Sequence, residues 1–171
     1  MLLNNIKSQL TYIIGTLFGI GFFPIMSGTI ATFTIAIVWW LIPDYFFYNT
    51  IEQTIHYDSY LYLSIFLIIS GFLSVFICTK CEKKFGHDAS SIVIDEAFGY
   101  LFAILFLPKT LMIAIYAFIL FRIFDISKPL FINKLQNLPK GWGIMIDDIV
   151  SGIIANIILQ ILIFLKPQFF I

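Results

Sequence analysis

Two adjacent carboxylates, Asp147 and Asp148, precede an apolar run over residues 149–165 that contains no charged residue. The run is nearly as long as the roughly 20 residues that an α-helix needs to cross a bilayer. We therefore expect the two carboxylates to lie at a membrane boundary. Gly141 and Gly143 can bend the backbone close to a ligand, and a helix N-terminus at this point would offer free N–H groups to an anion. These features suggest a site for a metal ion and a phosphate.

The composition is that of an integral membrane protein. Hydrophobic residues make up 60% of the chain and charged residues only 12%, whereas a soluble domain has about 25% charged residues. The formal net charge is zero and the Lys and Arg residues are scattered, which argues against a nucleic-acid-binding protein. The N-terminal segment lacks a small-residue cleavage pattern, so we expect it to be retained. The length of 171 residues fits a single membrane-embedded domain, residues 1–171.

Five further apolar runs predict an all-α fold, a polytopic membrane bundle of about five to six helices. They cover residues 6–20, 29–42, 60–78, 91–107 and 110–124. The sequence leaves open whether residues 6–20 span the membrane, re-enter it or lie at its interface. Residues 19–29 contain three glycines and a proline, which predicts an irregular turn. Irregular backbone at membrane depth needs cover from protein or a water-filled cavity. This turn is therefore expected to line or support a site, the alternative being a plain interhelical loop.

Positive charges predict the orientation, because short loops rich in Lys and Arg stay on the cytoplasmic side. Two loops carry them, at Lys80, Lys83 and Lys84 and at Lys128, Lys134 and Lys140. The loop of residues 44–59 has acids but no Lys or Arg, so it is expected on the opposite face. Alternation of the helices then brings the polar ends of the other runs together on the cytoplasmic face.

Most of the acidic residues converge on that face. Beside His87, Arg122 and Lys128, the set comprises Asp88, Asp95, Glu96, Asp125, Asp147 and Asp148. Asp95 and Glu96 are expected one to two turns inside their helix, where an ionisable residue indicates a function because its burial in hydrocarbon is unfavourable. The alternative, that both snorkel to the interface, is weakened by their short side chains.

Helical spacing predicts which carboxylates point into the bundle. Glu96 shares a helical face with Gly99 and Ala103, and small residues at this spacing are typical of close helix packing. The last helix has a comparable face, which carries Asp148, Gly152, Ala155 and Asn156. We therefore expect Glu96 and Asp148 to point inward and Asp147 to be rotated toward the loop.

Arg122 and Asp125 are three positions apart and can form an ion pair on one helix, which by itself would suit a simple helix end. Lys128 precedes Pro129, which favours an extended turn. The surrounding carboxylates repel one another unless cations neutralise them, and the few nearby Arg and Lys residues cannot balance six acids. Mg²⁺ suits such a cluster, because it binds carboxylate oxygens and substrate phosphate.

Other sites and enzyme classes lack their signatures. Cys78 and Cys81 form a C-x-x-C pair, but no further ligands or thioredoxin-like context accompany them, so we expect two reduced thiols at a helix end. The sequence contains no Cys-x5-Arg loop, D-x-D-x-[TV] motif, Walker A sequence or G-x-S-x-G elbow. The remaining interpretation is a metal-assisted phosphoryl hydrolysis on a scaffold other than those of these enzyme classes.

Three blocks of the sequence, and one turn, resemble the phosphatidylglycerophosphatase A family. The blocks are residues 86–96, which include Gly-His-Asp and Asp-Glu, residues 121–129 and residues 143–152, and the turn ends in Gly28-Thr29. The chain departs from the family pattern at Ser27 and in Leu130-Phe131, where a proline is usual, and at Ala31-Thr32, where a Gly-Ser pair is usual. These departures concern the shape of two loops, whereas the charged set is complete.

The resemblance implies an enzyme, a Mg²⁺-dependent phosphatase that removes the terminal phosphate of phosphatidylglycerol phosphate and gives phosphatidylglycerol. The enzyme would be a multi-pass protein of the bacterial inner membrane with its active site facing the cytoplasm. The proposed metal ligands, which would also position a water, are Asp95, Glu96, Asp125, Asp147 and Asp148. Arg122, Lys128 and Thr29 would bind the phosphate, and His87 or Asp88 would assist the leaving oxygen as a general acid.

The alternative function is a transporter or channel in which the same carboxylates bind a cation in transit. Two features weigh against it: the acids lie at helix ends on one face, and the sequence shows no internal repeat of the kind common in transporters. A structural membrane protein would leave the inward carboxylates without a purpose. The enzyme is therefore the favoured interpretation.

Overall fold

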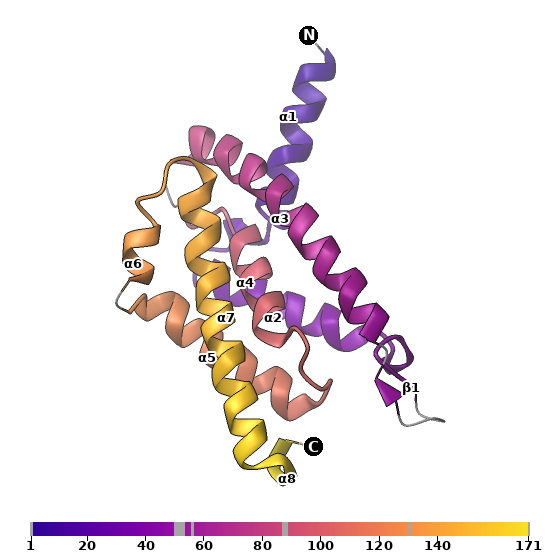
Figure 1. Ribbon diagram of the computed structural model, residues 1–171. Helices are drawn as coiled ribbons and strands as arrows, with labels where there is room; N and C mark the ends of the chain where they lie inside the picture. The colour runs from indigo at the N-terminus through magenta and orange to yellow at the C-terminus, as the bar shows by residue number, and fades with distance from the viewer. Residues whose placement is uncertain (1, 50–53, 56, 87–88, 130, 171) are drawn as a thin grey trace.

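The helices follow the apolar runs of the sequence, because a helix satisfies the backbone polar groups of an apolar segment internally. The computed structural model describes residues 2–49, 54–55, 57–86, 89–129 and 131–170. Apart from one short antiparallel strand pair, its elements are helical, as predicted (Figure 1). In chain order they are α1 (Leu2–Gly15), η1 (Ile20–Phe22), α2 (Ser27–Leu41), η2 (Asp44–Phe46), β1 (Tyr48–Asn49), β2 (Thr54–Ile55), α3 (Tyr57–Phe85), α4 (Ile94–Ile104), α5 (Leu111–Ser127), α6 (Ile132–Leu135), α7 (Gly141–Leu165) and α8 (Pro167–Phe170).

The short helix α4 lies at the centre of the arrangement (Figure 1). It packs against α7, α2, α5 and α3, whereas α1 packs against α3 and projects away from the other helices. The buried core includes Tyr100 and Phe98 of α4, Phe121 of α5 and Met145 of α7. Residues at the start of α4 are therefore enclosed by several helices.

Gly99 on α4 and Gly152 on α7 allow these two helices to touch, which confirms the prediction from small-residue spacing. A Cβ atom at Gly152 would lie 2.1 Å from the carbonyl oxygen of Gly99. On the same face of α7, the side-chain amide of Asn156 donates to the carbonyl oxygens of Ala103 and Leu105 at 3.0 and 2.8 Å. This contact fixes α4 relative to the face of α7 that carries Asp148.

Gly152→Ala is expected to destabilise the protein by about 1–3 kcal/mol, because the added methyl group meets backbone that cannot rotate away. Thermal unfolding in detergent, followed by circular dichroism, measures the effect. Gly71→Ala is the matched control, since a Cβ atom there has its nearest neighbour at 3.9 Å and alanine favours the helix. A Gly152→Ala protein that unfolds at the wild-type temperature would contradict the tight contact.

Two helices, α3 over Asp58–Phe85 and α7 over Gly141–Leu165, are long and apolar enough to cross a membrane by length and composition. The runs at 91–107 and 110–124 instead contain helices of 11 and 17 residues, short of the roughly 20 that a crossing takes. The apolar helix α2 has 15 residues. The multi-pass bundle therefore stays a prediction, as does the placement of the first apolar run.

The start of α7 differs from the sequence-based expectation. The helix begins at Gly141, so Asp147 and Asp148 lie in its second turn and not at its N-terminus. Contacts with α3 fix this start: the Gly141 N–H donates to Thr79 Oγ1 at 3.0 Å, and a Cβ atom at Gly141 would lie 2.3 Å from the carbonyl oxygen of Val75. The predicted helix N-terminus beside the carboxylates of α7 is therefore wrong.

The start of α4 also differs. The helix begins at Ile94, which puts Asp95 and Glu96 in its first turn rather than deeper inside it. The preceding residue, Val93, is held outside the helix by a hydrogen bond from its N–H to the carbonyl oxygen of Gly15 at 3.0 Å. The helix N-terminus near the carboxylates thus belongs to α4, where its positive dipole end stabilises negative charge.

The two cysteines of the C-x-x-C pair lie within the packed part of α3. Cys78 and Cys81 are free and buried, which confirms the prediction of two unpaired thiols. They lie inside α3 rather than at its end, because the helix continues to Phe85. Cys81 packs against Gly15 of α1.

Candidate active site

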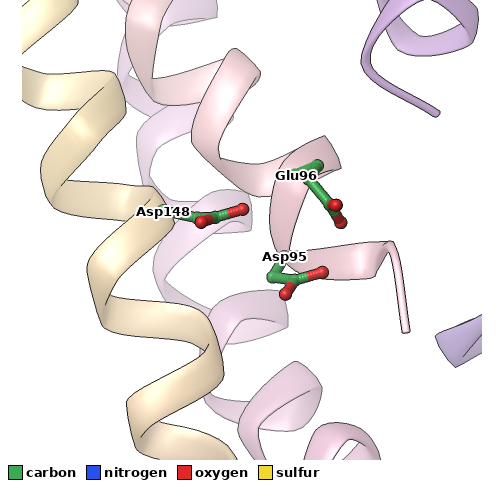
Figure 2. Close-up of side chains that lie close together, drawn as sticks. All are labelled: Asp95, Glu96 and Asp148. Carbon is green, nitrogen blue, oxygen red and sulfur yellow. The ribbon is translucent and has the colours of Figure 1, made fainter. Parts of the chain in front are cut away.

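Three carboxylates from two helices form a compact cluster, in which Asp95 and Asp148 are buried and Glu96 is half-buried. Asp95 and Glu96 come from the first turn of α4, and Asp148 comes from the second turn of α7 (Figure 2). One oxygen of each lies within 4.8 Å of the others. The exposed fractions of Asp95 and Asp148 are 6% and 2%. Because burial next to like charge is unfavourable for ionised carboxylates, a bound cation would stabilise the cluster.

Each of the three carboxylates has an oxygen without a hydrogen bond. Among the described residues, Asp95 Oδ1, Glu96 Oε2 and Asp148 Oδ2 are buried and have no hydrogen-bond partner. Buried polar atoms are nearly always satisfied in folded proteins. Carboxylate oxygens that converge in this way form the kind of donor set that binds a hard divalent cation.

Arg122 and Asp125 of α5 border the cluster. The Arg122 guanidinium donates from Nη1 to Asp125 Oδ2, which confirms the predicted ion pair. The pair is almost buried, since the two side chains are 15% and 10% exposed. The Arg122 Nε group is buried and has no hydrogen-bond partner among the described residues. The guanidinium therefore keeps a buried donor that no described residue uses and that suits an anion.

Lys128 is the C-cap of α5 and links that helix to α7. Its ammonium forms an ion pair with Asp147 and lies 4.0 Å from Asp125 Oδ1. Burial lowers the pKa of Lys128, but the hydrogen bond to Asp147 and the nearby carboxylates outweigh this effect, so the pKa is raised. The ammonium is therefore charged at neutral pH.

Asp147 was expected to be rotated toward the loop, and it pairs with Lys128, where that loop begins, while being 1% exposed. The expectation for the backbone of Lys128 is wrong. Lys128 was expected in an extended turn, yet it adopts a left-handed conformation with φ 39° and ψ 57°. Such a conformation is unfavourable by about 1–3 kcal/mol outside glycine. The ion pair and the hydrogen bond from the Lys128 N–H to the carbonyl oxygen of Phe124 at 2.9 Å hold it in place.

The end of the predicted irregular turn, residues 27–29, forms the first turn of α2 and packs directly against the site. Ser27 Oγ donates to the carbonyl oxygen of Ser90 at 2.6 Å, which ties the turn to the segment before α4. A Cβ atom at Gly28 would lie 2.0 Å from Glu96 Oε1 and 3.3 Å from Arg122 Nη1. The turn thus lines the site, one of the two roles that the sequence predicted for it.

Gly28→Ala is expected to lower kcat/KM for phosphate release by about 10²-fold, because misplacing a catalytic group by about 1 Å has an effect of this size. The Glu96 carboxylate ends a flexible side chain, so it can swing away from the new methyl group while the fold persists. Steady-state kinetics of the variant and of the Gly71→Ala control measure the effect. Equal activity in all three proteins would show that the position of Glu96 is not critical.

The remaining predicted residues are placed as follows. Thr29 follows Gly28 in the first turn of α2 and is half-buried. His87 and Asp88 lie outside the described residues. The sequence analysis named the turn but did not single out Gly28, because its contact with Glu96 joins residues far apart in the chain.

The comparisons identify the family. The sequence profile described as Phosphatidylglycerophosphatase A matches residues 13–163. A relative from Bacteroides thetaiotaomicron, which carries the provisional name phosphatidylinositol-3-phosphatase, is 34% identical over 90% of this chain and 94% of its own length. Phosphatidylglycerophosphatase A from Escherichia coli K12 is 32% identical over 81% of this chain and 74% of its own length.

A further relative is also named phosphatidylglycerophosphatase A. Phosphatidylglycerophosphatase A from Haemophilus influenzae Rd is 39% identical over 58% of this chain and 65% of its own length. No solved structure matches the chain significantly. The profile covers most of the chain, including the helices that carry the carboxylate cluster, Arg122 and Lys128. The chain therefore belongs to the phosphatidylglycerophosphatase A family and is a phosphatase.

Proposed function

We propose that the protein hydrolyses the terminal phosphate monoester of phosphatidylglycerol phosphate, giving phosphatidylglycerol and inorganic phosphate, in a Mg²⁺-dependent reaction. One observation carries the proposal: the carboxylate cluster has buried oxygens without partners, Arg122 has a buried Nε–H without a partner among the described residues, and the Glu96 carboxylate and the Arg122 guanidinium adjoin the same point beside Gly28. The oxygens suit a divalent cation and the N–H suits a phosphate oxygen. Together they suit a metal ion and a phosphate bound side by side.

The cation would be held by Asp95, Glu96 and Asp148, whose oxygens converge. When bound, Mg²⁺ would neutralise this cluster and polarise the phosphoryl group. Asp125 and Asp147 were also predicted as ligands. Because each pairs with a cationic side chain, we assign them to orient Arg122 and Lys128.

The phosphate would be bound by Arg122 and Lys128. The guanidinium offers directed N–H donors and the ammonium a point charge. During hydrolysis a water oxygen gives up one proton and forms a bond to phosphorus, the bond from phosphorus to the glycerol oxygen breaks, and that oxygen takes up a proton. The buried carboxylates would position the water, and His87 or Asp88 would supply the proton to the leaving oxygen.

A membrane location follows from the lipid substrate and from the apolar surface. We propose a multi-pass protein of the bacterial inner membrane whose site faces the cytoplasm. The apolar helices α3 and α7, and exposed side chains such as Phe72 and Leu73, support this location. The comparisons give no support to the alternative, a cation transporter or channel.

The names of the relatives point to two different lipid substrates, because one refers to an inositol lipid and two refer to phosphatidylglycerol phosphate. The substrate of this protein therefore has to be tested. The test compares phosphate release from phosphatidylglycerol phosphate and from phosphatidylinositol 3-phosphate in mixed micelles with Mg²⁺. We expect kcat/KM to be about tenfold or more higher for phosphatidylglycerol phosphate, a difference of about 1.4 kcal/mol in transition-state binding. Equal values, or a preference for the inositol lipid, would contradict the proposed substrate.

A further inference from the structure

A groove with entirely apolar lining runs between α2 and α5. It has a volume of about 260 Å³, and four side chains from each helix line it. Ala36 and Ala114 are small lining residues, whereas Ile37 and Ile115 are exposed at 45% and 44%. The groove thus opens on the outer surface of the helix arrangement.

The two helices that form the groove also carry groups of the candidate active site. Gly28, in the first turn of α2, adjoins Glu96 and Arg122, and Arg122 itself belongs to α5. Phe33 and Phe118, whose ring centroids are 6.3 Å apart, lie at the end of the groove nearer to these residues. The far end is at Trp40 of α2 and Leu111 of α5. An antiparallel helix pair therefore connects the groove with the guanidinium.

The distance along α2 from the active-site end to the far end of the groove is close to the thickness of the hydrocarbon in one leaflet. From Gly28 to Trp40, α2 rises by about 18 Å, at roughly 1.5 Å per residue. The hydrocarbon of one leaflet is about 15 Å thick. A lipid whose phosphate is held at Arg122 could thus place one acyl chain along the groove over its whole depth.

We infer that the groove binds an acyl chain of the lipid whose phosphate is bound at Arg122. The inference rests on the proposed function, since it takes the substrate to be a diacyl lipid phosphate. The occupant follows from the chemistry of the two helices: an apolar groove on the helices that also carry Arg122 and Gly28, one turn or more beyond its end, fits a molecule with an anionic head and a hydrocarbon tail. The groove would contribute to substrate binding without taking part in the chemical step.

The kinetic test uses Ala36→Phe and Ala114→Phe, which fill the groove, and Ile37→Trp, which narrows its mouth at an exposed position. Ile69→Trp is the control, because Ile69 is 59% exposed on α3 and is not a lining residue. Each protein is assayed with long-chain phosphatidylglycerol phosphate in micelles and with the deacylated, water-soluble phosphomonoester. We expect KM for the diacyl lipid to rise about tenfold in the groove variants with kcat unchanged, and kcat/KM for the deacylated substrate to stay at the wild-type value.

An equal loss on both substrates, or no change on either, would overturn the inference. A second measurement separates it from the proposed function. A diacyl lipid phosphate with a diazirine at the end of one chain is photolysed with the wild-type protein, and the labelled residues are identified by mass spectrometry. Labelling on Ile37, Ile115 or their neighbours, reduced in Ala114→Phe, supports the groove even if no phosphate is released; labelling elsewhere, unaffected by that variant, overturns it.

Discussion

Asp148→Asn is expected to lower kcat for phosphate release by about 10³-fold. Asp148 is a buried member of a cluster of three carboxylates whose oxygens lie within 4.8 Å of one another. An amide keeps the size of the side chain but removes the negative charge that a divalent cation requires. Metal ions stabilise the charge of a transition state by several kcal/mol, and each 1.36 kcal/mol corresponds to about a factor of ten in rate. Steady-state kinetics with saturating lipid and Mg²⁺ measure the loss.

Asp44→Asn is the matched control for this substitution. Asp44 follows α2 at the end opposite to Gly28 and forms an ion pair with Lys109 at 2.8 Å, with its own side chain 70% exposed. The same chemical change at this position should leave kcat unaltered. If Asp148→Asn is folded and retains more than a tenth of the wild-type kcat, the buried cluster is not the catalytic centre.

Arg122→Ala is expected to lower kcat/KM by about 10²–10³-fold, as the loss of a preorganised donor to a developing charge does in other enzymes. The change removes the buried Nε donor that has no partner among the described residues and also the partner of Asp125. A stability loss of about 3–5 kcal/mol is expected as well, because Asp125 would be left buried with only the more distant Lys128. Kinetics and thermal unfolding in detergent separate the two effects.

Two further variants distinguish phosphate binding from folding. Arg122→Lys keeps the charge and loses the directed N–H donors, so its stability should approach that of the wild type while its activity stays low. The double variant Arg122→Ala/Asp125→Asn removes the buried charge and should recover stability without recovering activity. Recovery of activity together with stability would show that Arg122 serves only the fold.

The helix faces could be predicted from the sequence, because the period of a helix fixes them locally. Gly99 and Gly152 were each expected on a packing face, and the two residues meet. Arg122 and Asp125 were expected to pair because three positions bring side chains together on one helix, and they do. Local spacing is sufficient for inferences of this kind.

The helix starts and the contacts between distant segments could not be predicted. Hydropathy indicates where an apolar run begins, but Gly141 starts α7 earlier because it packs against α3. Similarly, nothing near Asp147 in the sequence indicates that Lys128 pairs with it, or near Gly28 that Glu96 lies beside it. These features depend on how the helices pack, which residue spacing within one segment does not encode.

Phosphate release by the purified protein with and without metal tests the central claim most directly. The protein is treated with EDTA, its metal content is checked by elemental analysis, and release from phosphatidylglycerol phosphate is measured before and after Mg²⁺ is added. We expect release at background level in the metal-free protein and full recovery with Mg²⁺, because the buried carboxylates would otherwise repel one another and leave the phosphate unpolarised. Undiminished release by the verified metal-free protein would contradict the assignment of Asp95, Glu96 and Asp148 as a catalytic metal site.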